Sequence, residues 1–313
     1  MIKALVLAFS ALLACSGAAL AQTAPATPPR FSHVFLIVME NHTLANVLAN
    51  PAAPTFRSLA RQGAVADAYY GLTHPSEPNY LGLLAGDTFG VHDDGTDRAL
   101  PGGTLVDSLE SAGYSWKGYF EGLPEAGANV GAAGRFPADY AKKHNPFMLF
   151  AGVAGNPARR ARVVPLTQLQ PDAELGDQPD FSLIVPNECN DMHSCGVAQA
   201  DAFLSRTVAE IQASPAWDAN AALFVTFDEG VTDAGCCGQT AGGGKIGLIA
   251  LSPSAKPGYV SWTPYNHYSL LRTIEDSWGL PLIGHSADPQ ISPMADLFSA
   301  PAYPAFDRFM LLI

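Results

Sequence analysis

Short apolar runs alternate with amphipathic segments along most of the chain. The apolar runs lack the polar alternation of half-exposed strands, so they predict strands that are buried on both faces of a parallel sheet. The expected strands are 33–39 (HVFLIVM), 64–68, 114–119, 180–185, 221–227 and 245–251. The expected helices are 55–63, 79–85, 104–112, 197–213 and 267–278. This alternation predicts an α/β fold with a mostly parallel central sheet flanked by helices.

No internal repeat or linker divides the body of the chain, so residues 31–313 are expected to form a single domain. Two stretches rich in loop-forming residues, 122–135 and 152–178, are candidates for a small cap over the functional site. Residues 22–30 (QTAPATPPR) are a Pro/Ala tether that we expect to be disordered.

The first 21 residues predict an export signal. Lys3 precedes an apolar stretch, 4–14, which is too short to span a membrane, and Ala19 and Ala21 are small residues of the kind that a signal peptidase recognises. Cleavage is expected after Ala21, which predicts a secreted or periplasmic protein without a transmembrane segment. The alternative is a lipoprotein anchored at Cys15, because the preceding residues loosely resemble a lipidation motif.

The chain is acidic, with a formal net charge of −12. Such a charge disfavours nucleic acid and anionic membrane surfaces as partners, since both would repel it. A small phosphorylated substrate stays compatible with this charge, because a bound metal reverses the sign locally.

Four cysteines follow the expected signal peptide, and in an exported protein they predict disulfides. Cys189 and Cys195 are expected to pair across a short loop. The adjacent Cys236 and Cys237 form either a vicinal bridge or two free thiols. The spacing disfavours a zinc site.

Three of the apolar runs end in residues that can bind a metal ion. These residues are Glu40, Asn41 and His42 after the first run, Asn187 to His193 after the fourth, and Asp228 and Glu229 after the fifth. The carboxyl ends of parallel strands meet at one edge of a sheet, so we expect these groups to converge. Any one of these groups could equally be made of turn residues and helix caps, but that interpretation is less attractive for all three together. Because unpaired buried carboxylates are costly, their convergence would favour a divalent cation.

Ser76 lies immediately before an expected helix, in the stretch Thr73-His74-Pro75-Ser76-Glu77-Pro78-Asn79-Tyr80. It is either a simple helix cap or a nucleophile activated by a metal ion, next to helix N–H groups that suit a phosphate. No Gly-x-Ser-x-Gly sequence surrounds it, which disfavours a hydrolase of the nucleophile-elbow type.

Five motifs occur in a characteristic order: Val38–His42, His74–Tyr80, Lys143–Phe147, Pro186–His193 and Phe227–Gly230. Together they resemble the bacterial and fungal acid phosphatase / phospholipase C phosphoesterase family, within the alkaline phosphatase superfamily. The resemblance covers about 31–285, nearly all of the expected mature chain.

The resemblance implies a role for each matching residue. The implied metal ligands are Glu40, Asn41, Ser76, Asp228 and Glu229, the last standing where relatives often have Asp or His. The implied catalytic residues are Ser76, His144 and His193, and the implied substrate-binding residues are Asn79, Asp191 and His267. The cofactor is a divalent ion, with Mg, Ca, Mn, Zn and Fe all compatible with the ligand types.

The expected function is therefore a secreted, metal-dependent phosphoric monoester hydrolase that acts through a phosphoserine intermediate. The first alternative is a phosphodiesterase of the phospholipase C type that uses the same site. The second is a non-catalytic metal- or phosphate-binding surface protein, which would have no need of a nucleophile.

Overall fold

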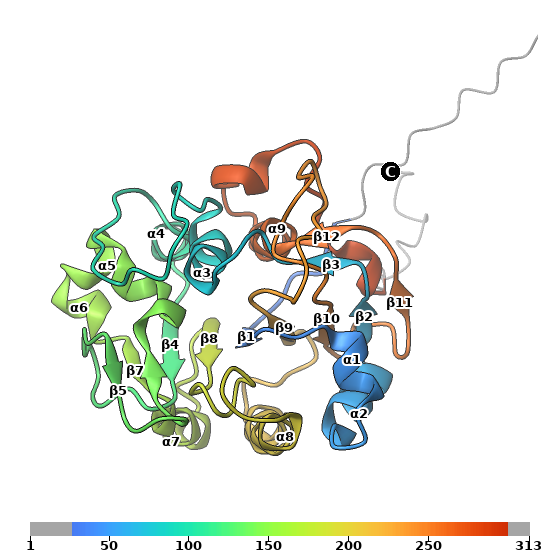
Figure 1. Cartoon of the computed structure of the whole chain (residues 1–313), viewed down its shortest axis with the longest axis horizontal. Helices are drawn as coiled ribbons and strands as arrows, with labels where there is room; N and C mark the ends of the chain where they lie inside the picture. Colours follow the sequence, from blue (N-terminus) through green and yellow to red (C-terminus); the bar gives the residue numbers. More distant parts are fainter. Residues whose placement is uncertain (1–26, 300–313) are drawn as a thin grey trace, which may run out of the picture.

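The computed structural model describes residues 27–299, and an eight-stranded mixed sheet lies at its centre (Figure 1). The strand order is β11-β2-β10-β9-β1-β8-β4-β7. Its strands are β1 (Val34–Met39), β2 (Ala64–Ala66), β4 (Trp116–Phe120), β7 (Val163–Pro165), β8 (Phe181–Val185), β9 (Ala222–Phe227), β10 (Leu248–Leu251) and β11 (Val260–Ser261). All residues of β1, β8, β9 and β10 are buried, as expected for strands covered on both faces.

Helices cover both faces of this sheet (Figure 1). On one face lie α3 (Ser76–Ala85), α4 (Leu105–Ser111) and α9 (His267–Trp278); on the other lie α1 (Leu44–Ala49), α2 (Pro54–Gln62), α7 (Leu169–Leu175) and α8 (Val197–Ala213). The short helices α5 (Ala151–Ala154) and α6 (Pro157–Arg160) precede β7. Two small sheets pair β3 (Tyr69–Tyr70) with β12 (Tyr265–Asn266), and β5 (Ala132–Ala133) with β6 (Tyr140–Ala141). The 3₁₀ turns are 142–144, 146–149, 166–168, 284–287 and 295–297.

The predicted α/β class and mostly parallel sheet are confirmed. Strand β1 pairs in parallel with β8 and β9, and β4 pairs in parallel with β7 and β8. The exception is β10, which runs antiparallel to both β2 and β9. Helices α8 and α9 have the predicted bounds, and most other predicted elements differ from the observed ones by one to three residues.

Three sequence-based expectations need correction. Helix α3 begins at Ser76 rather than at residue 79, so Ser76 is the first helical residue and Pro75 is the cap residue. Strand β10 begins at Leu248, not 245, because Gly247 has a φ of 89° that interrupts an extended run. Residues 152–178 form no cap: they contain α6, β7 and α7 and complete one edge of the sheet.

The predicted Cys189–Cys195 disulfide is present, and Cys236 and Cys237 form a vicinal disulfide. The expected signal peptide, with Ala21 and Cys15, lies outside the described residues. Of the expected tether, only 27–30 is described, and these residues form no helix or strand. Within 27–299, no helix combines the length and apolarity needed to cross a membrane.

Candidate active site

The end of the central strand β1 contributes the first two residues of the site. Glu40 follows β1 directly and is fully buried, and its main-chain N–H donates to the carbonyl of Asp191 at 2.9 Å. Asn41 adopts the left-handed region, with a φ of 52°. This conformation is favoured by Asn among residues with a side chain. Its side-chain amide donates to Glu40 Oε2 at 3.0 Å, which sets the direction of the amide oxygen.

The neighbouring strand β9 ends in two acidic residues that lie beside the first pair. Asp228 is fully buried, and its Oδ1 accepts the main-chain N–H of Asn41 at 3.3 Å. Glu229 is 6% exposed and points toward Ser76. The predicted convergence of the strand ends is thus observed between β1 and β9.

Ser76 lies between the acidic groups of these two strands. Its Oγ is 3.2 Å from Glu40 Oε2 and 3.4 Å from Glu229 Oε1, and the residue is 2% exposed. The side chain makes no capping hydrogen bond to α3, which removes the helix-cap interpretation. The hydroxyl therefore points into the acidic cluster rather than toward its own helix.

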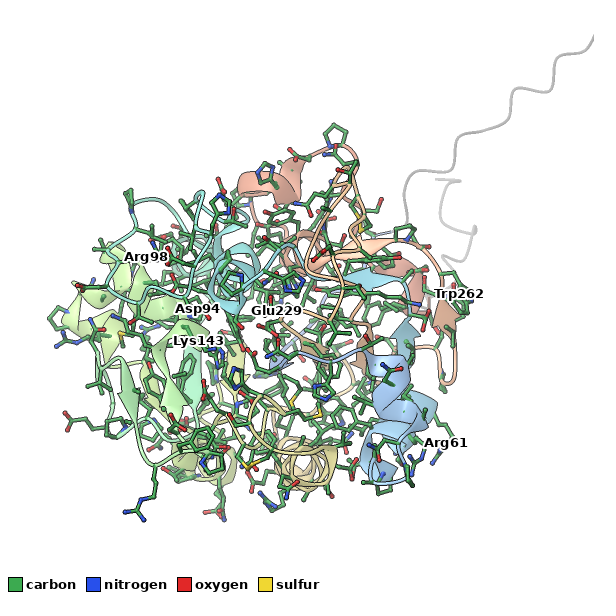
Figure 2. All side chains as sticks on the ribbon, in the orientation of Figure 1. Arg61, Asp94, Arg98, Lys143, Glu229 and Trp262 are labelled. Carbon is green, nitrogen blue, oxygen red and sulfur yellow. A yellow bond between two sulfur atoms is a disulfide. The ribbon has the colours of Figure 1, made fainter. Side chains whose placement is uncertain are left out.

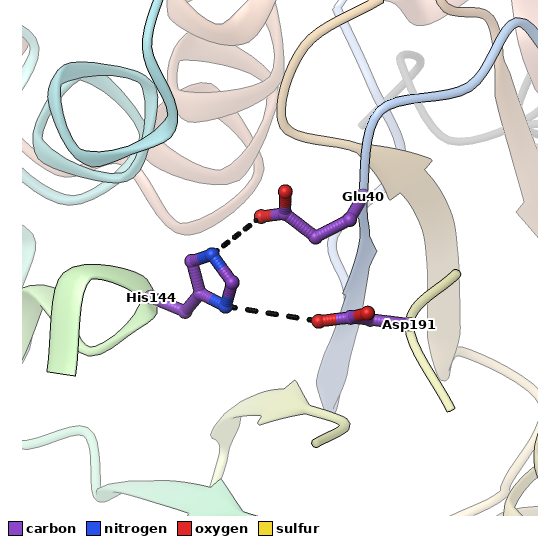
Figure 3. Close-up of side chains that lie close together, drawn as sticks. All are labelled: Glu40, His144 and Asp191. Carbon is purple, nitrogen blue, oxygen red and sulfur yellow. Dashed lines mark ion pairs between the residues drawn. The ribbon is translucent and has the colours of Figure 1, made fainter. Parts of the chain in front are cut away.

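His144 and Asp191 complete the site on the other side of Glu40 (Figure 3). His144 Nε2 lies 2.9 Å from Glu40 Oε1, and its Nδ1 lies 3.7 Å from Asp191 Oδ2. The imidazole stacks on Tyr80 of α3, with ring centroids 5.2 Å apart. Glu40, His144 and Asp191 each offer a donor atom, and these atoms all lie within 4.8 Å of one another.

We call Glu40, Asp191, Asp228 and Glu229 the carboxylate cluster. Burial raises the pKa of Glu40 to about 7, that of Asp191 to about 9 and that of Glu229 to about 7. Burial also raises the pKa of Asp228, and the charge of Glu40 adds to the effect. Four buried acids that resist ionisation together are a costly arrangement unless a cation neutralises them.

The cluster residues fit a divalent cation. Within the described part of the chain, Asp191 Oδ2 and Asp228 Oδ2 are buried atoms without a hydrogen-bond partner, and His144 Nε2 makes an ion-pair contact with Glu40 Oε1 at 2.9 Å but no hydrogen bond. Each is an oxygen or imidazole nitrogen of the kind that binds Mg, Mn, Zn or Fe. Such unsatisfied groups are rare in folded proteins, and a bound ion would supply the missing partner of those that coordinate it.

His74 supports Glu229 from behind. Its Nδ1 lies 2.6 Å from Glu229 Oε2, and its Nε2 lies 3.1 Å from the carbonyl of Thr232. Burial lowers the pKa of His74, but the hydrogen bond to Thr232 and the charge of Glu229 outweigh it and raise the pKa overall. Because both partners accept hydrogen bonds, the ring fits best as an imidazolium that holds Glu229 ionised.

Lys143 is a cation at the edge of the site. It begins the motif Lys143–Phe147, but the sequence did not predict it as a site residue. Figure 2 labels Lys143 and Asp94 close together, in the same region of the view as Glu229. Lys143 Nζ lies 3.5 Å from Asp94 Oδ2 and 3.3 Å from His193 Nε2. Burial lowers its pKa, but the charges of Glu40, Asp94, Glu188 and Asp228 outweigh burial and raise it, so the ammonium persists at neutral pH.

Asp94 also occupies the amino end of α3. Its Oδ1 accepts the main-chain N–H of Glu77 at 3.0 Å, so this helix N–H, expected to face a phosphate, already has an anionic partner. Asp94 lies in a loop without helix or strand, and no periodic pattern identified it.

Two of the residues predicted to bind substrate, Asn79 and His267, instead make their hydrogen bonds within the protein. Asn79 is buried, and its amide makes four hydrogen bonds to main-chain atoms of Leu72, Thr73 and Pro75, which fasten the loop before Ser76. His267 is buried between the Tyr69 hydroxyl and the carbonyl of Asp228, so both ring nitrogens are engaged within the protein. These contacts indicate that both residues position the site. His193 is an exposed residue at the rim of the site.

Comparison with known proteins identifies the family. A model of the Phosphoesterase family matches residues 45–281, most of the described chain. The chain belongs to the phosphoesterase family. It is 36% identical over 275 residues to the phosphatidylinositol-3-phosphatase of Mycobacterium tuberculosis, an alignment that covers 86% of this chain and 84% of that one. It is 29% identical over 262 residues to an acid phosphatase of Aspergillus fumigatus, covering 81% and 56% respectively.

The solved structures that this phosphoesterase resembles share its fold. A Vibrio parahaemolyticus protein in the alkaline phosphatase superfamily superposes with a TM-score of 0.57 at 13% identity, covering 88% of this chain and 72% of that one. Murine ectonucleotide pyrophosphatase / phosphodiesterase 5 superposes with a TM-score of 0.56 at 12% identity, covering 86% and 100%. The predicted resemblance is confirmed, and the phosphoesterase is a phosphoric ester hydrolase. It spans 56–62% of the length of the fungal acid phosphatases that it matches.

Proposed function

We propose that this phosphoesterase is a metal-dependent phosphoric monoester hydrolase in which Ser76 is the nucleophile. One observation carries the proposal: the Ser76 Oγ lies 3.2 Å from Glu40 and 3.4 Å from Glu229, inside the carboxylate cluster and at the amino end of α3. A hydroxyl that serves no cap and faces acceptors only is suited to lose its proton.

The metal would be held by Glu40, Asn41, Ser76, Asp228 and Glu229, with His144 and Asp191 as donors on the far side of Glu40. A divalent ion bound there supplies positive charge that lowers the pKa of the hydroxyl and balances the phosphoryl oxygens. Burial lowers the pKa of His144 to about 4, so at neutral pH this imidazole is uncharged and suited to donate its lone pair.

The protein's own groups define the two chemical steps. The Ser76 oxygen attacks phosphorus, the bond from phosphorus to the alcohol oxygen breaks, and the hydroxyl proton passes to Glu229, 3.4 Å away. Burial and the charge of Lys143 lower the pKa of His193, so this uncharged ring at the rim would hydrogen-bond the phosphoryl group, and the departing alcohol oxygen takes its proton from water. Water then attacks phosphorus, the bond from phosphorus to the Ser76 oxygen breaks, and Glu229 returns its proton to that oxygen as phosphate leaves. Lys143 stabilises the phosphoryl charge through both steps.

The relatives favour monoester substrates over the alternatives. The M. tuberculosis and A. fumigatus relatives are both named as phosphatases, and the first spans almost the same length as this chain. A phosphodiesterase of the phospholipase C type would use the same cluster, whereas a non-catalytic binding protein would give Ser76 no role.

The experiment is metal analysis of the purified protein combined with turnover of a phosphate monoester and of a choline phosphodiester. We expect a bound divalent ion, faster turnover of the monoester, and loss of turnover after chelation that returns when the ion is restored. Faster turnover of the diester would favour the phospholipase C alternative. Absence of turnover with metal bound would favour the binding protein.

We also propose that the protein is exported, since residues 1–21 have the pattern of a signal peptide and two disulfides occur in the folded chain. Sequencing the amino terminus of the mature protein tests this. A terminus at Gln22 supports export by simple cleavage, and a lipidated Cys15 supports the lipoprotein alternative.

A further inference from the structure

A groove adjoins the site at Asn41. It has a volume of about 410 Å³, and its walls are Asn41, His42, Thr43, Asn46, Val47, Asn50, Val197 and Val231. This volume lies within the range of ligand-binding pockets, roughly 300 to 1,000 Å³. A larger hollow of about 570 Å³ elsewhere on the molecule includes none of the cluster residues.

The groove lies on the side of the site that faces away from the nucleophile. Ser76 begins α3, whereas the groove is lined by α1, by the start of α8 and by the residue that follows Gly230. In Figure 1, α3 lies on one side of the end of β1, and α1 and α8 lie on the other. In phosphoryl transfer the attacking and departing oxygens are roughly in line across phosphorus. An alcohol that departs opposite Ser76 therefore leaves toward this groove.

The chemistry of the walls defines what the groove would accept. Three valines offer apolar contact, and Asn46, Asn50 and Thr43 offer uncharged hydrogen-bonding groups. None of the eight lining residues is acidic or is a lysine or arginine. Arg57, which contacts Asn50, donates its guanidinium to the carbonyls of Leu48, Asn50 and Pro51 instead.

The charges around the groove disfavour a second anionic group on the alcohol that it would bind. The carboxylate cluster borders the groove through Asn41, and Lys143 lies beside Asp94 and His193 at the rim, not among the groove residues. A further phosphate on the alcohol would face carboxylates without a compensating cation, which is unfavourable in a partly buried site.

We propose that this groove is the alcohol subsite, and that the enzyme selects phosphate monoesters of neutral, hydroxylated alcohols over esters that bear a second phosphate. The inference rests on the proposed function, because it assumes attack by Ser76. Val231 at the mouth, 69% exposed, and Asn46 on the exposed face of α1 determine the selection.

The first test fills the groove. Glucose 6-phosphate and methyl phosphate share an alkyl leaving group, but only the first can occupy the subsite. We expect Asn46→Trp to lower the ratio of kcat/KM for glucose 6-phosphate to that for methyl phosphate about tenfold, the equivalent of one lost hydrogen bond and its contacts. Ala45→Trp is the matched control, because Ala45 is an exposed residue of the same helix that does not line the groove. Equal ratios in the two variants would overturn the proposal.

The second test changes the charge at the mouth. We expect Val231→Lys to raise the ratio of kcat/KM for fructose 1,6-bisphosphate to that for glucose 6-phosphate about threefold, as a partly exposed ion pair forms. Leu175→Lys adds the same charge at another exposed apolar residue, on α7, and should leave the ratio as in the wild type. An unchanged ratio in Val231→Lys refutes the subsite while leaving Ser76 chemistry intact. Failure of the wild-type enzyme to hydrolyse any of the three esters would overturn the proposed function and the subsite together.

Discussion

Ser76 and Asp228 lie in the same site but contribute different things to it. In the proposed mechanism the serine supplies the atom that attacks, whereas the aspartate supplies negative charge and accepts the main-chain N–H of Asn41. We expect Ser76→Ala to lose at least about a thousandfold in kcat while still binding a divalent ion. We expect the isosteric change Asp228→Asn to lose activity and metal together.

Turnover and metal content, measured on both variants, distinguish these roles. A Ser76→Ala enzyme within about tenfold of wild-type kcat would rule out the phosphoserine and leave a water molecule as the nucleophile. Thermal unfolding of both variants serves as the control for folding.

Asp94 would compete with a bound phosphate for positively charged groups. Its carboxylate accepts the Glu77 N–H and lies 3.5 Å from Lys143 Nζ. In Asp94→Asn the amide oxygen can still accept from the N–H, but the charge that attracts Lys143 is gone. We therefore expect the inhibition constant of inorganic phosphate to fall about two- to fivefold, as for the loss of a partly exposed ion pair.

The neighbouring substitution Asp93→Asn is the control, because Asp93 pairs with Arg98 rather than with Lys143. Lys143→Met removes the cation and should raise the inhibition constant of phosphate. If Asp94→Asn weakened phosphate inhibition instead, Asp94 would be a positioning group for Lys143 rather than a competitor.

At the scale of elements, helix α9 contains an acid that the fold keeps protonated. Glu275 is fully buried; its Oε1 accepts from the Ile283 N–H at 3.1 Å, and its Oε2 lies 2.6 Å from Ser286 Oγ. Burial raises the pKa of Glu275 to about 8. The Ser286 hydroxyl has one proton and can donate it to the Ile283 carbonyl, 2.8 Å away. The short contact between Ser286 Oγ and Glu275 Oε2 is then a hydrogen bond in which a protonated Glu275 is the donor.

This arrangement predicts a pH dependence of stability. Between pH ~4.5 and 8 the unfolded chain ionises Glu275 while the folded protein retains the proton, so the free energy of unfolding falls as pH rises through that window. Glu275→Gln keeps the hydrogen bonds and does not titrate. We expect it to gain about 1–3 kcal/mol relative to wild type between pH 5 and pH 8 in urea unfolding. A parallel pH dependence of the two proteins would contradict the assignment.

The comparison of predicted and observed elements shows what apolar patterns can and cannot reveal. Helix α8 was predicted with its observed bounds because 17 residues give a clear helical period, and β1 was recognised because six buried residues follow one another. Strands β7 and β11 have three and two residues and offer no period to read. The antiparallel direction of β10 depends on the path of the connecting loop, which side-chain pattern does not encode.

The site residues also fall into those that the sequence pattern can predict and those that it cannot. Glu40, Ser76 and Asp228 were predictable because they follow strands or begin a helix, where the position in sequence indicates the position in space. The contribution of Lys143 depends on a 3₁₀ turn, and that of Asp94 on an irregular loop. Asn79 and His267 belong to the right motifs, but their hydrogen bonds to the main chain became visible only in three dimensions.

For the whole molecule, the carboxylate cluster links stability to metal and to pH. In metal-free protein the raised pKa values of Glu40, Asp191 and Glu229 mean that the fold binds more protons than the unfolded chain between pH ~4 and about 7 to 9. The free energy of unfolding of the metal-free protein therefore falls as pH rises through this window, by a few kcal/mol in order of magnitude.

A divalent ion bound at the proposed site would reverse this trend, since it would bind the ionised carboxylates. We expect the unfolding temperature of chelated protein to fall between pH 5 and pH 8. We expect the increase on adding Mg²⁺, Mn²⁺ or Zn²⁺ to be larger at pH 8 than at pH 5. Calorimetry with and without chelator measures both, and an increase independent of pH would show that the cluster is not the binding site.

The strand order has a consequence for when the enzyme can first become active. Strands β9, β1 and β8 are neighbours in the sheet, yet β1 ends at Met39, and Asp228 and Glu229 follow β9 nearly two hundred residues later. Pairings between such distant segments form slowly and late, because the intervening chain must first be brought together. A growing or partly translocated chain that stops before β9 has Ser76 but neither of these two acids. If Ser76 is the nucleophile, catalysis can begin only after the chain through Glu229 has emerged and β9 has paired with β1, so a shorter chain would not hydrolyse phosphate esters.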